Sequence, residues 1–358
     1  MSFALYVSPS TKIPINILLP IFDQTNMMSP LVTISIPLYK CADFLEGCLN
    51  SVLKQTYANL EVTLINDDTP DNSVQIAKDF ITKHQLETWE IIHLEKNSGL
   101  SVVRNKGIDT AKGKYLFFLD SDDTVTPDCI QKLVEVGERT GAQMVVSQIE
   151  CEQFKTGHKH FCMGQLNQLQ TIVGNEQVFA AFVEGKILSS AVNKLFVVNY
   201  LHQEKIYFVP GLFAQDELWT FQLALRLNSV AFHQDTTYTY YLHDKSVIHN
   251  RGKRNFDNWF TIGQYIDKEY KNESNKARKN LILKYLIHYK SLTLQMNWKA
   301  QKNKELWKES YQNYKTLSSL PLIDYFSKDY SNTSKKLNLF NQLPTELGFM
   351  LFKWRYER

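Results

Sequence analysis

The sequence contains few cysteines, and none of them belongs to a CxxC pair. The 358 residues include five, at positions Cys41, Cys48, Cys129, Cys151 and Cys162. An odd number without paired spacing argues against a disulfide framework and favours a reducing compartment. Long hydrophobic runs are missing too, because no stretch approaches the roughly 18 to 20 apolar residues that cross a bilayer. Residues 13–22 are interrupted by prolines and do not resemble a signal peptide. We therefore expect a soluble, cytoplasmic protein.

Several common enzyme signatures are also absent. No GxGxxG follows the first strand-like segment, so dinucleotide binding has no fingerprint. The sequence has no HExxH, no Cys/His cluster with zinc spacing and no GxSxG nucleophile elbow. These absences leave carboxylates as the main candidates for chemistry.

The composition is that of a folded globular protein. The 44% hydrophobic content excludes a disordered tail, and nothing repeats as in a collagen or a coiled coil. The length suggests about two domains. The formal net charge of +3 is unevenly spread, because residues 251–358 carry 21 Lys and Arg against 10 Asp and Glu, and the first 250 residues carry 19 against 27. Two regions with different partners are therefore expected.

The first 150 residues alternate between strand-like and helix-like segments. Strands are predicted at residues 31–37, 60–65, 89–94, 114–119 and 143–149. Helices are predicted between them at residues 44–53, 73–80 and beyond, 100–111, and onward from Pro127. This alternation is typical of βαβ units and a mostly parallel sheet, which binds ligands beyond the carboxyl ends of its strands.

After residue 150 the pattern loosens. It predicts helices at 176–183 and 214–227, a strand at 230–242, and helices from residue 255 onward.

Acidic side chains follow two of the predicted strands. Residues 120–123, Asp-Ser-Asp-Asp, come directly after the apolar run 115–119, and Asp67 follows the strand at 60–65. Carboxylates at i and i+2 can converge on Mg²⁺ or Mn²⁺, whose other positions are filled by phosphate oxygens and water. Asp67 could accept a hydrogen bond from a nucleotide base. The alternatives are a helix-capping turn at 120–123 and an Asx turn without a ligand at Asp67.

Five motifs occur in a characteristic order. They are LVTISIPLY at 31–39, QTY at 55–57, NDDTPDNS at 66–73, NSGLSVVRN at 97–105 and FLDSDD at 118–123. Together they resemble the nucleotide-binding half of the family 2 glycosyltransferases. The resemblance covers residues 31–150 and continues more weakly through 193–195, 215–217 and 240–242.

The resemblance implies an α/β architecture, the GT-A nucleotide-diphospho-sugar transferase fold, with a Rossmann-like, mostly parallel sheet and a helical C-terminal region. Residues 1–30 would be an N-terminal extension and 31–250 the GT-A domain, divided into a nucleotide-binding half (31–150) and an acceptor-side half (151–250). Residues 251–358 would form a basic, aromatic C-terminal region. The implied activity is inverting, metal-dependent transfer of a hexosyl group from a UDP-sugar to a glycan or lipid-linked acceptor, as in bacterial capsule, exopolysaccharide or lipo-oligosaccharide synthesis.

The resemblance also assigns the donor-binding residues. Pro37 and Tyr39 would flank the base, and Asp67 would accept its N3–H. Arg104 would line the nucleotide and diphosphate, and Asp120 would contact the ribose or a metal-bound water.

Metal binding and catalysis fall on other positions in the resemblance. Asp122 would bind Mn²⁺ or Mg²⁺, and His243 lies where some relatives supply a further ligand. Asp216 matches the base that deprotonates the acceptor hydroxyl. The alternatives are a helix N-terminal charge for Asp216 and an ordinary surface or core histidine for His243. Lys194 would either meet a diphosphate or be solvated.

Two residues depart from the family pattern. Asp68 replaces a glycine in the turn after the second strand, and Asp tolerates positive φ better than most residues. Gln215 replaces the glutamate before the base, so the pKa of Asp216 should be lower than in relatives. Neither change is expected to disable the enzyme.

The C-terminal region allows two interpretations. Tryptophans occur among many lysines, and residues 347–356 combine apolar and basic side chains. Such a segment could hold the protein peripherally on the anionic inner face of the plasma membrane. The alternative is a helical subdomain with its aromatics packed inward. No motif indicates nucleic-acid binding.

Two other functions remain open. A non-catalytic nucleotide-sugar binding protein could keep the same fold, and a nucleotidyltransferase shares the βαβ logic. The retained Asp120, Asp122 and Asp216 argue against the first. The segment at 37–41, Pro-Leu-Tyr-Lys-Cys, argues against the second, which would carry a Gly-rich basic loop there.

Overall fold

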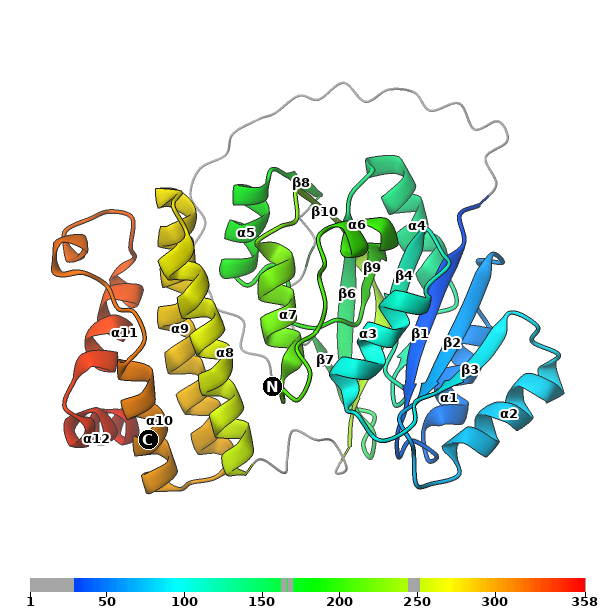
Figure 1. Cartoon of the computed structure of the whole chain (residues 1–358), viewed down its shortest axis with the longest axis horizontal. Coiled ribbons are helices and arrows are strands. Elements are labelled where there is room, and N and C mark those ends of the chain that lie inside the picture. The colour runs from blue at the N-terminus through cyan, green and yellow to red at the C-terminus, as the bar shows by residue number, and fades with distance from the viewer. Residues whose placement is uncertain (1–28, 162–165, 167–169, 244–251, 358) are drawn as a thin grey trace.

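The chain builds a mixed sheet flanked by helices, followed by a bundle of helices (Figure 1). The computed structural model describes residues 29–161, 166, 170–243 and 252–357. The predicted extension at 1–30 therefore lies almost wholly outside the described residues.

Ten described strands form one sheet in the order β3-β2-β1-β4-β9-β6-β10-β5, with β7 beside β6 and β8 beside β10. Their bounds are β1 Val32–Leu38, β2 Leu60–Asn66, β3 Trp89–His93, β4 Tyr115–Phe118, β5 Thr124–Val125, β6 Met144–Gln153, β7 Lys159–Phe161, β8 Thr171–Val173, β9 Lys194–Val197 and β10 Ser229–Leu242. The first four strands are parallel to one another, and so are β6 and β10. β9 is antiparallel to both of its neighbours.

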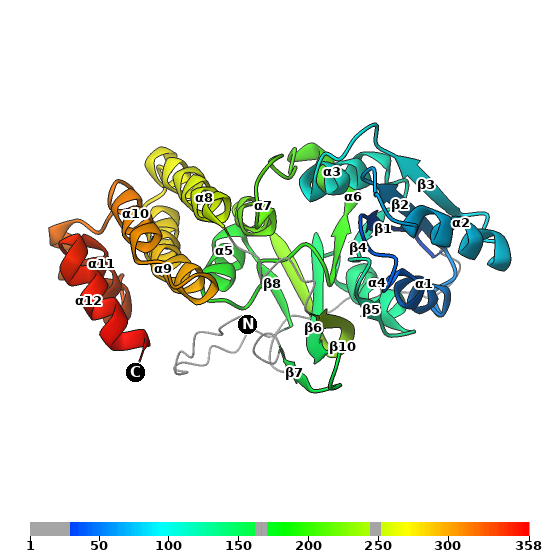
Figure 2. The same ribbon diagram turned by 90° about the horizontal axis from the view of Figure 1, so that it is seen from below.

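The helices that follow the strands cover both faces of the parallel part. Their bounds are α1 Leu45–Leu53, α2 Ser73–His84, α3 Leu100–Thr110, α4 Cys129–Thr140, α5 Asn175–Val183, α6 Val198–Gln203 and α7 Gln215–Ala224. α1, α2 and α4 lie on one side of this part, and α3 and α6 lie on the other (Figure 2). The predicted parallel α/β sheet is confirmed, because buried β-rich runs alternate with amphipathic helices along the first 150 residues.

The rest of the described chain is helical. It comprises α8 Lys253–Asn272, α9 Lys276–Ala300, α10 Lys304–Lys315, the 3₁₀ helix η2 Leu322–Tyr325, α11 Asn332–Gln342 and α12 Thr345–Tyr356. α9 packs on α5 and α8 packs on α7, whereas α11 and α12 lie at the end away from the sheet (Figures 1 and 2). Three of the tryptophans in this region, Trp259, Trp298 and Trp307, are buried, as expected for a helical subdomain with its aromatics packed inward. None of the helices in the described ranges is both long and apolar enough to cross a membrane.

The cysteines depart from one expectation. Cys41, Cys48 and Cys129 are free and buried, as predicted for reduced thiols. Cys151, on β6, is disulfide-bonded. The sequence could not predict this bond, because spacing alone does not report which strands bring two thiols together. Cys162 lies outside the described residues.

Candidate functional site

The candidate site forms where three parallel strands end. β1 and β2 are paired up to Leu38 and Asn66, and β4 pairs with β1 up to Phe118. The parallel register therefore brings the segments after these strands to one edge of the sheet, as predicted. Asp67 follows β2 there, and the acidic turn at residues 120–123 follows β4.

Asp67 is almost fully buried and anchors the loop before α3. Its side chain is 3% exposed and accepts hydrogen bonds from the backbone N–H of Ser98 (2.6 Å) and of Gly99 (2.9 Å). Asn97 Nδ2 also donates to it, at 3.0 Å. Each carboxylate oxygen can accept more than one bond, so recognition of a base by Asp67 stays a prediction. The loop contact itself was not predicted.

The turn after β2 has the predicted conformation. Asp68 has φ 53°, the left-handed region that the family's glycine would favour, so the substitution leaves the turn intact. Asn66 Oδ1 accepts from the N–H of Thr69, three residues on, at 3.0 Å, so the Asn66 side chain supports this turn. Asp71 accepts from the N–H of Ser73 at 3.2 Å, whereas the N-cap of α2 is Asn72, whose side chain makes no capping bond.

Tyr39 and Pro37 lie at the same edge. Pro37 is half-buried within β1, and Tyr39 just beyond it is 41% exposed. Lys40 Nζ lies 5.1 Å from the centre of the Tyr39 ring. An exposed aromatic ring beside a strand end suits stacking on a base, and that role stays a prediction.

Arg104 connects the two sides of the site. It comes from α3, is 2% exposed, and donates from Nη2 to Asp120 Oδ1 at 2.9 Å. Its Nη1 donates to Asp216 Oδ1, and its guanidinium carbon lies 5.5 Å from the Phe208 ring centre. Both ends of the guanidinium fork therefore meet a carboxylate, an arrangement that suits Arg and not Lys. This bridge was not predicted, because its partners are distant in the sequence.

Asp216 lies in the first turn of α7. Besides the pair with Arg104, its Oδ2 accepts from the N–H of Ala191 at 3.4 Å. Burial raises the pKa of this carboxyl above that of an ordinary aspartate, and Asp120 adds to the increase, whereas Arg104 and Lys194 oppose it. Asp216 therefore lies at the N-terminus of a helix, as predicted. It also forms an ion pair with the buried Arg104, which was not predicted.

Lys194 has neither of its two predicted environments. It is 1% exposed, and its Nζ donates to the carbonyl of Ser190 (2.7 Å), to Ser190 Oγ (3.0 Å) and to the carbonyl of Val192 (3.3 Å). It thus holds the turn whose Ala191 N–H faces Asp216. Burial lowers the pKa of Lys194 to about 7, although Asp216 acts in the opposite direction.

Asp123 is the inward member of the acidic turn. It is fully buried and accepts from the Tyr238 hydroxyl at 2.6 Å and from the N–H of Tyr241 at 3.0 Å. Burial raises its pKa well above the ordinary value, and Asp122 and Asp120 add to this. Asp123 therefore fastens β10 to the turn. The sequence could not show which of the adjacent carboxylates points inward.

Asp122 and His243 are brought together, as the metal prediction requires. His243 Nε2 lies 2.9 Å from Asp122 Oδ2, and the imidazole stacks on Phe44 with ring centres 4.4 Å apart. Burial and Asp120 raise the pKa of Asp122, whereas His243 lowers it. His243 Nδ1 is buried and makes no hydrogen bond within the described residues.

A cation here would have few protein ligands. Nowhere in the described ranges do three or more His, Cys, Asp or Glu side chains gather into a metal-binding group. Asp122 and His243 would therefore supply two ligands, and a nucleotide diphosphate and water the rest. A carboxylate with phosphate oxygens and water is the usual set for Mg²⁺ or Mn²⁺, so Asp122 fits such an ion, whereas the imidazole of His243 is a ligand type that Mg²⁺ seldom takes.

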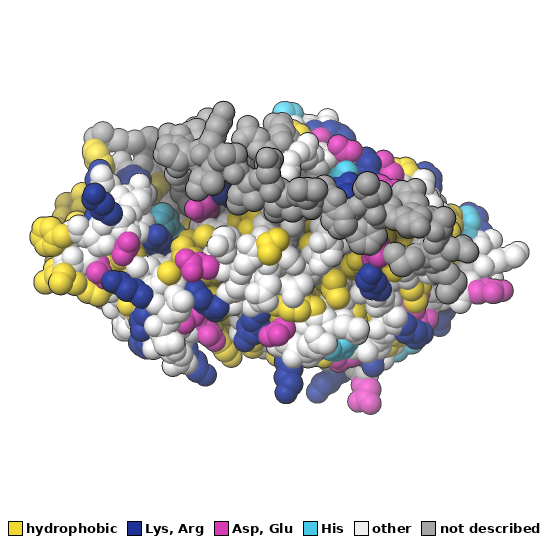
Figure 3. Space-filling view, turned by 90° about the horizontal axis from the view of Figure 1, so that it is seen from above, with side chains coloured by type: hydrophobic (Ala, Val, Ile, Leu, Met, Phe, Trp, Pro, Cys, Tyr) yellow, Lys and Arg dark blue, Asp and Glu magenta, His cyan; other side chains and the backbone are white. Residues whose placement is uncertain are grey.

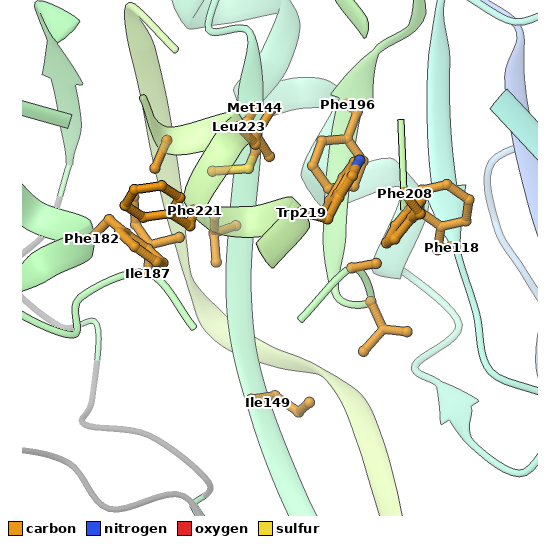
Figure 4. Packing of buried hydrophobic residues seen from close by; sticks show 14 of the residues in the cluster. Phe118, Met144, Ile149, Phe182, Ile187, Phe196, Phe208, Trp219, Phe221 and Leu223 are labelled. Carbon is orange, nitrogen blue, oxygen red and sulfur yellow. The ribbon is translucent and has the colours of Figure 1, made fainter. Parts of the chain in front are cut away.

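The core beneath α7 holds Asp216 in place. Trp219, one turn after Asp216, stacks on Phe208 at 4.4 Å and meets Phe118 and Phe196 edge-on (Figure 4). Phe118 is the last residue of β4, and only Leu119 separates it from the acidic turn. One aromatic cluster thus supports both carboxylate-bearing segments.

The C-terminal bundle contacts the same helix. The Tyr285 hydroxyl of α9 donates to Glu217, the neighbour of Asp216. Asn258 of α8 accepts from the N–H of Phe213, just before α7. Burial raises the pKa of Glu217. These supports were not predicted.

The comparisons with known proteins agree with this geometry. The model of glycosyl transferase family 2 matches residues 33–189, a span that contains β2, β4 and both acidic turns but ends before Asp216 and His243. Over this span, the chain is similar to the family 2 glycosyltransferases. The resemblance seen in the sequence motifs is thereby confirmed.

Relatives named as glycosyltransferases match more of the chain. EpsH of Bacillus subtilis is 27% identical over 304 residues, which are 83% of this chain and 86% of EpsH. YibD of Escherichia coli is 27% identical over 71% of this chain and 74% of its own length. A teichuronic acid biosynthesis glycosyltransferase of B. subtilis, TuaG, is 35% identical over 30% of this chain and 41% of its own length.

The fold extends to solved structures. S. aureus TarS, residues 1–349, crystallised with UDP-GlcNAc, superposes with a TM-score of 0.66 at 17% identity over 91% of this chain and 87% of TarS. The similarity confirms the predicted family fold, helical C-terminal region included.

Proposed function

We propose that this family 2 glycosyltransferase carries out an inverting, metal-dependent transfer of a hexosyl group from a UDP-sugar to a hydroxyl of a glycan or lipid-linked acceptor. One observation carries the proposal. Arg104 links Asp120 of the acidic turn to Asp216, 112 positions after Arg104 in the chain. A donor-side carboxylate and an acceptor-side carboxylate therefore share one buried cation.

The donor would bind across the strand ends. Tyr39 and Pro37 would contact the base from the end of β1, and Asp67 would accept its N–H. Asp120 would face the ribose or a water of the metal. The TarS structures solved with UDP-GlcNAc and with UDP support a UDP-sugar as donor.

Asp216 would act as the general base. It would take the proton of the acceptor hydroxyl, whose oxygen attacks the anomeric carbon from the face opposite the diphosphate. The bond from that carbon to the diphosphate oxygen breaks, and UDP leaves with the electron pair, which inverts the anomeric centre. Arg104 helps to keep Asp216 ionised, since a guanidinium beside a buried carboxylate lowers its pKa.

Asp122 and His243 would hold the divalent cation, Mn²⁺ or Mg²⁺. When bound, the ion neutralises charge that develops on the departing diphosphate. TuaG, named for teichuronic acid biosynthesis, supports polysaccharide synthesis as the setting. A non-catalytic binding protein is the weaker proposal, because it has no need for a carboxylate held by Arg104 in the first turn of α7.

Thermal stabilisation by ligands tests the site. A ligand at 100 times its dissociation constant adds about 2.7 kcal/mol to the free energy of unfolding. We expect UDP with Mn²⁺ to raise the melting temperature, and GDP or either component alone to raise it less. Asp122→Asn should abolish the metal-dependent part of the rise in melting temperature. Asp79→Asn, which changes an exposed carboxylate of α2, should leave that rise intact. An equal shift with and without Mn²⁺ would remove the metal from the proposal.

A further inference from the structure

α12 presents an apolar stripe on its outer side. Four large apolar side chains are exposed at helical spacing, Leu347 (41%), Met350 (65%), Leu351 (42%) and Trp354 (59%). Positions i, i+3, i+4 and i+7 lie on one side of an α-helix. We call these four residues the α12 stripe. α12 lies at the end of the molecule away from the sheet (Figures 1 and 2).

The opposite side of α12 packs against the other helices of the bundle. Phe349 and Phe352 are buried and pack on Trp307, with ring centres 5.2 and 4.8 Å away. A Cβ added at Gly348 would lie only 2.8 Å from the Tyr311 ring, so α12 sits close against α10. The helix is thus apolar on two sides, and packing within the bundle accounts for one of them.

Basic side chains flank the stripe. At 100° per residue, Lys353 and Arg355 lie on either side of it, and both are exposed. The acidic neighbours are already paired, Glu346 with Lys308 and Glu357 with Lys353 at 3.0 Å. Because Lys353 itself neutralises Glu357, the net positive charge beside the stripe comes from Arg355, in a region that carries 21 Lys and Arg against 10 Asp and Glu.

We infer that α12 docks the protein on an anionic phospholipid surface, with the stripe facing the acyl chains and Lys353 and Arg355 at the headgroups. An apolar stripe between basic edges is the pattern of a helix that lies in the membrane interface, and Trp favours that depth. At 12 residues, α12 is too short to span a bilayer, so it lies on the surface. This docking does not depend on the proposed transfer reaction.

A second exposed apolar group lies at the same end but lacks the basic edges. Leu322 and Ile323 of η2, together with Phe326, are more than three-quarters exposed. In Figure 3, hydrophobic side chains gather at the left-hand end of the face seen from above, the end that holds the C-terminal helices in Figure 1. Asp324 and Asp329 accompany this group with Lys328, so attraction to anionic lipid does not extend to it.

Vesicle flotation of the full chain tests the docking. We expect binding to vesicles of phosphatidylcholine mixed with phosphatidylglycerol, little binding to phosphatidylcholine alone, and weakening as salt rises from about 0.1 to 0.5 M. The variant Leu347→Asn/Met350→Asn/Leu351→Asn should lower the partition at least about tenfold. Lys353→Gln/Arg355→Gln should reduce binding to the anionic vesicles only.

The matched control is Leu322→Asn/Ile323→Asn, which removes similar apolar surface at the same end and should keep most of the binding. Circular dichroism would confirm that each variant is folded. Failure of the unchanged protein to bind anionic vesicles overturns the docking, as does a control that loses as much binding as the α12 variant. Self-association that the α12 variant abolishes, without vesicle binding, would instead make the stripe an interface between two copies of this chain.

Discussion

At the residue scale, the site depends on one guanidinium. Arg104 is almost fully buried between Asp120 and Asp216, and two carboxylates beside one cation leave an excess of negative charge. The two acids share the guanidinium, one at each Nη, so any ligand that draws Asp120 away changes the environment of Asp216. Binding on one side of the site can therefore be felt on the other.

Arg104→Lys should separate charge from geometry. Lysine keeps the positive charge but cannot bridge two carboxylates with a planar fork. We expect the free energy of unfolding to fall by about 1.5 to 3 kcal/mol, the range for hydrogen bonds to charged groups, and turnover to fall more than donor affinity. Urea unfolding and steady-state kinetics measure the two effects. Arg139→Lys, exposed at the end of α4, is the control, and unaltered turnover in Arg104→Lys would remove the bridge from catalysis.

Asp216 should set the acid limb of the pH profile. A general base works only when deprotonated, so turnover falls as pH drops through its pKa. Because burial raises that pKa, the fall should occur at a higher pH than the value of about 3.9 for a free aspartate. Asp216→Asn should cut transfer by about 10²- to 10⁴-fold, with UDP binding near normal. An Asn variant with the turnover of the unchanged enzyme would place the base elsewhere.

At the scale of elements, α7 is the point where sheet and bundle meet. Its first turn carries Asp216 and Glu217, and Trp219 anchors it in the core below the acidic turn. Glu217 receives the hydroxyl of Tyr285 from α9. The direction of Asp216 therefore depends on a helix of the C-terminal bundle.

Tyr285→Phe should expose this dependence. Loss of the hydroxyl takes from the partly buried Glu217 one of its two side-chain donors, Tyr285 and Ser189, at a cost of about 1 to 3 kcal/mol. Turnover should drop severalfold, and the KM for the donor should stay the same. Tyr330→Phe, which removes a 3.0 Å bond to Asn280 within the bundle, should reduce stability without affecting turnover. Equal effects of the two variants on turnover would contradict a positioning role for Tyr285.

The elements themselves were largely predictable. The strands and helices of the first 150 residues lie within one or two residues of their predicted ends at most boundaries, because buried β-rich runs alternate with amphipathic helices there. Short strands such as β5, β8 and β9 were missed, since two to four residues carry no readable period.

The site was predictable in its residues more than in its contacts. Asp67, Asp120, Asp122 and Asp216 were identified from motifs, and the structure places them along the predicted edge of the sheet and at the start of α7. The Arg104 bridge and the inward turn of Asp123 were not predicted. Each joins residues more than 100 positions apart, at 112 for Arg104–Asp216 and 115 for Asp123–Tyr238. Local patterns carry no information about such pairs.

At the scale of the whole molecule, sheet and bundle share one core. Tyr285 of α9 packs on Phe182 and Phe221, with ring centres 5.0 and 5.3 Å away. The two regions expected from the sequence, 31–250 and 251–358, are therefore in direct contact through buried aromatic rings. The boundary expected at residue 250 separates two parts of the sequence, but side chains from both parts pack together in one core.

We expect one cooperative unfolding transition for the described domain and bundle. Calorimetric and van't Hoff enthalpies should agree, because neither part can separate without exposing shared apolar surface. A truncation that removes residues 252–358 should lower the melting temperature, whereas a bundle that melts separately, ahead of the sheet, would contradict the shared core.

The pairing of Asp123 with β10 has a consequence for how the protein is made. The acidic turn leaves the ribosome 115 residues before Tyr238, which at about 5 to 20 residues per second is a delay of roughly 6 to 23 s. During that time the nascent chain contains Asp123 but not yet Tyr238, whose hydroxyl donates to the Asp123 carboxylate in the folded protein. The nucleotide-binding half should therefore stay loosely packed on the ribosome and acquire its final shape only when β10 arrives.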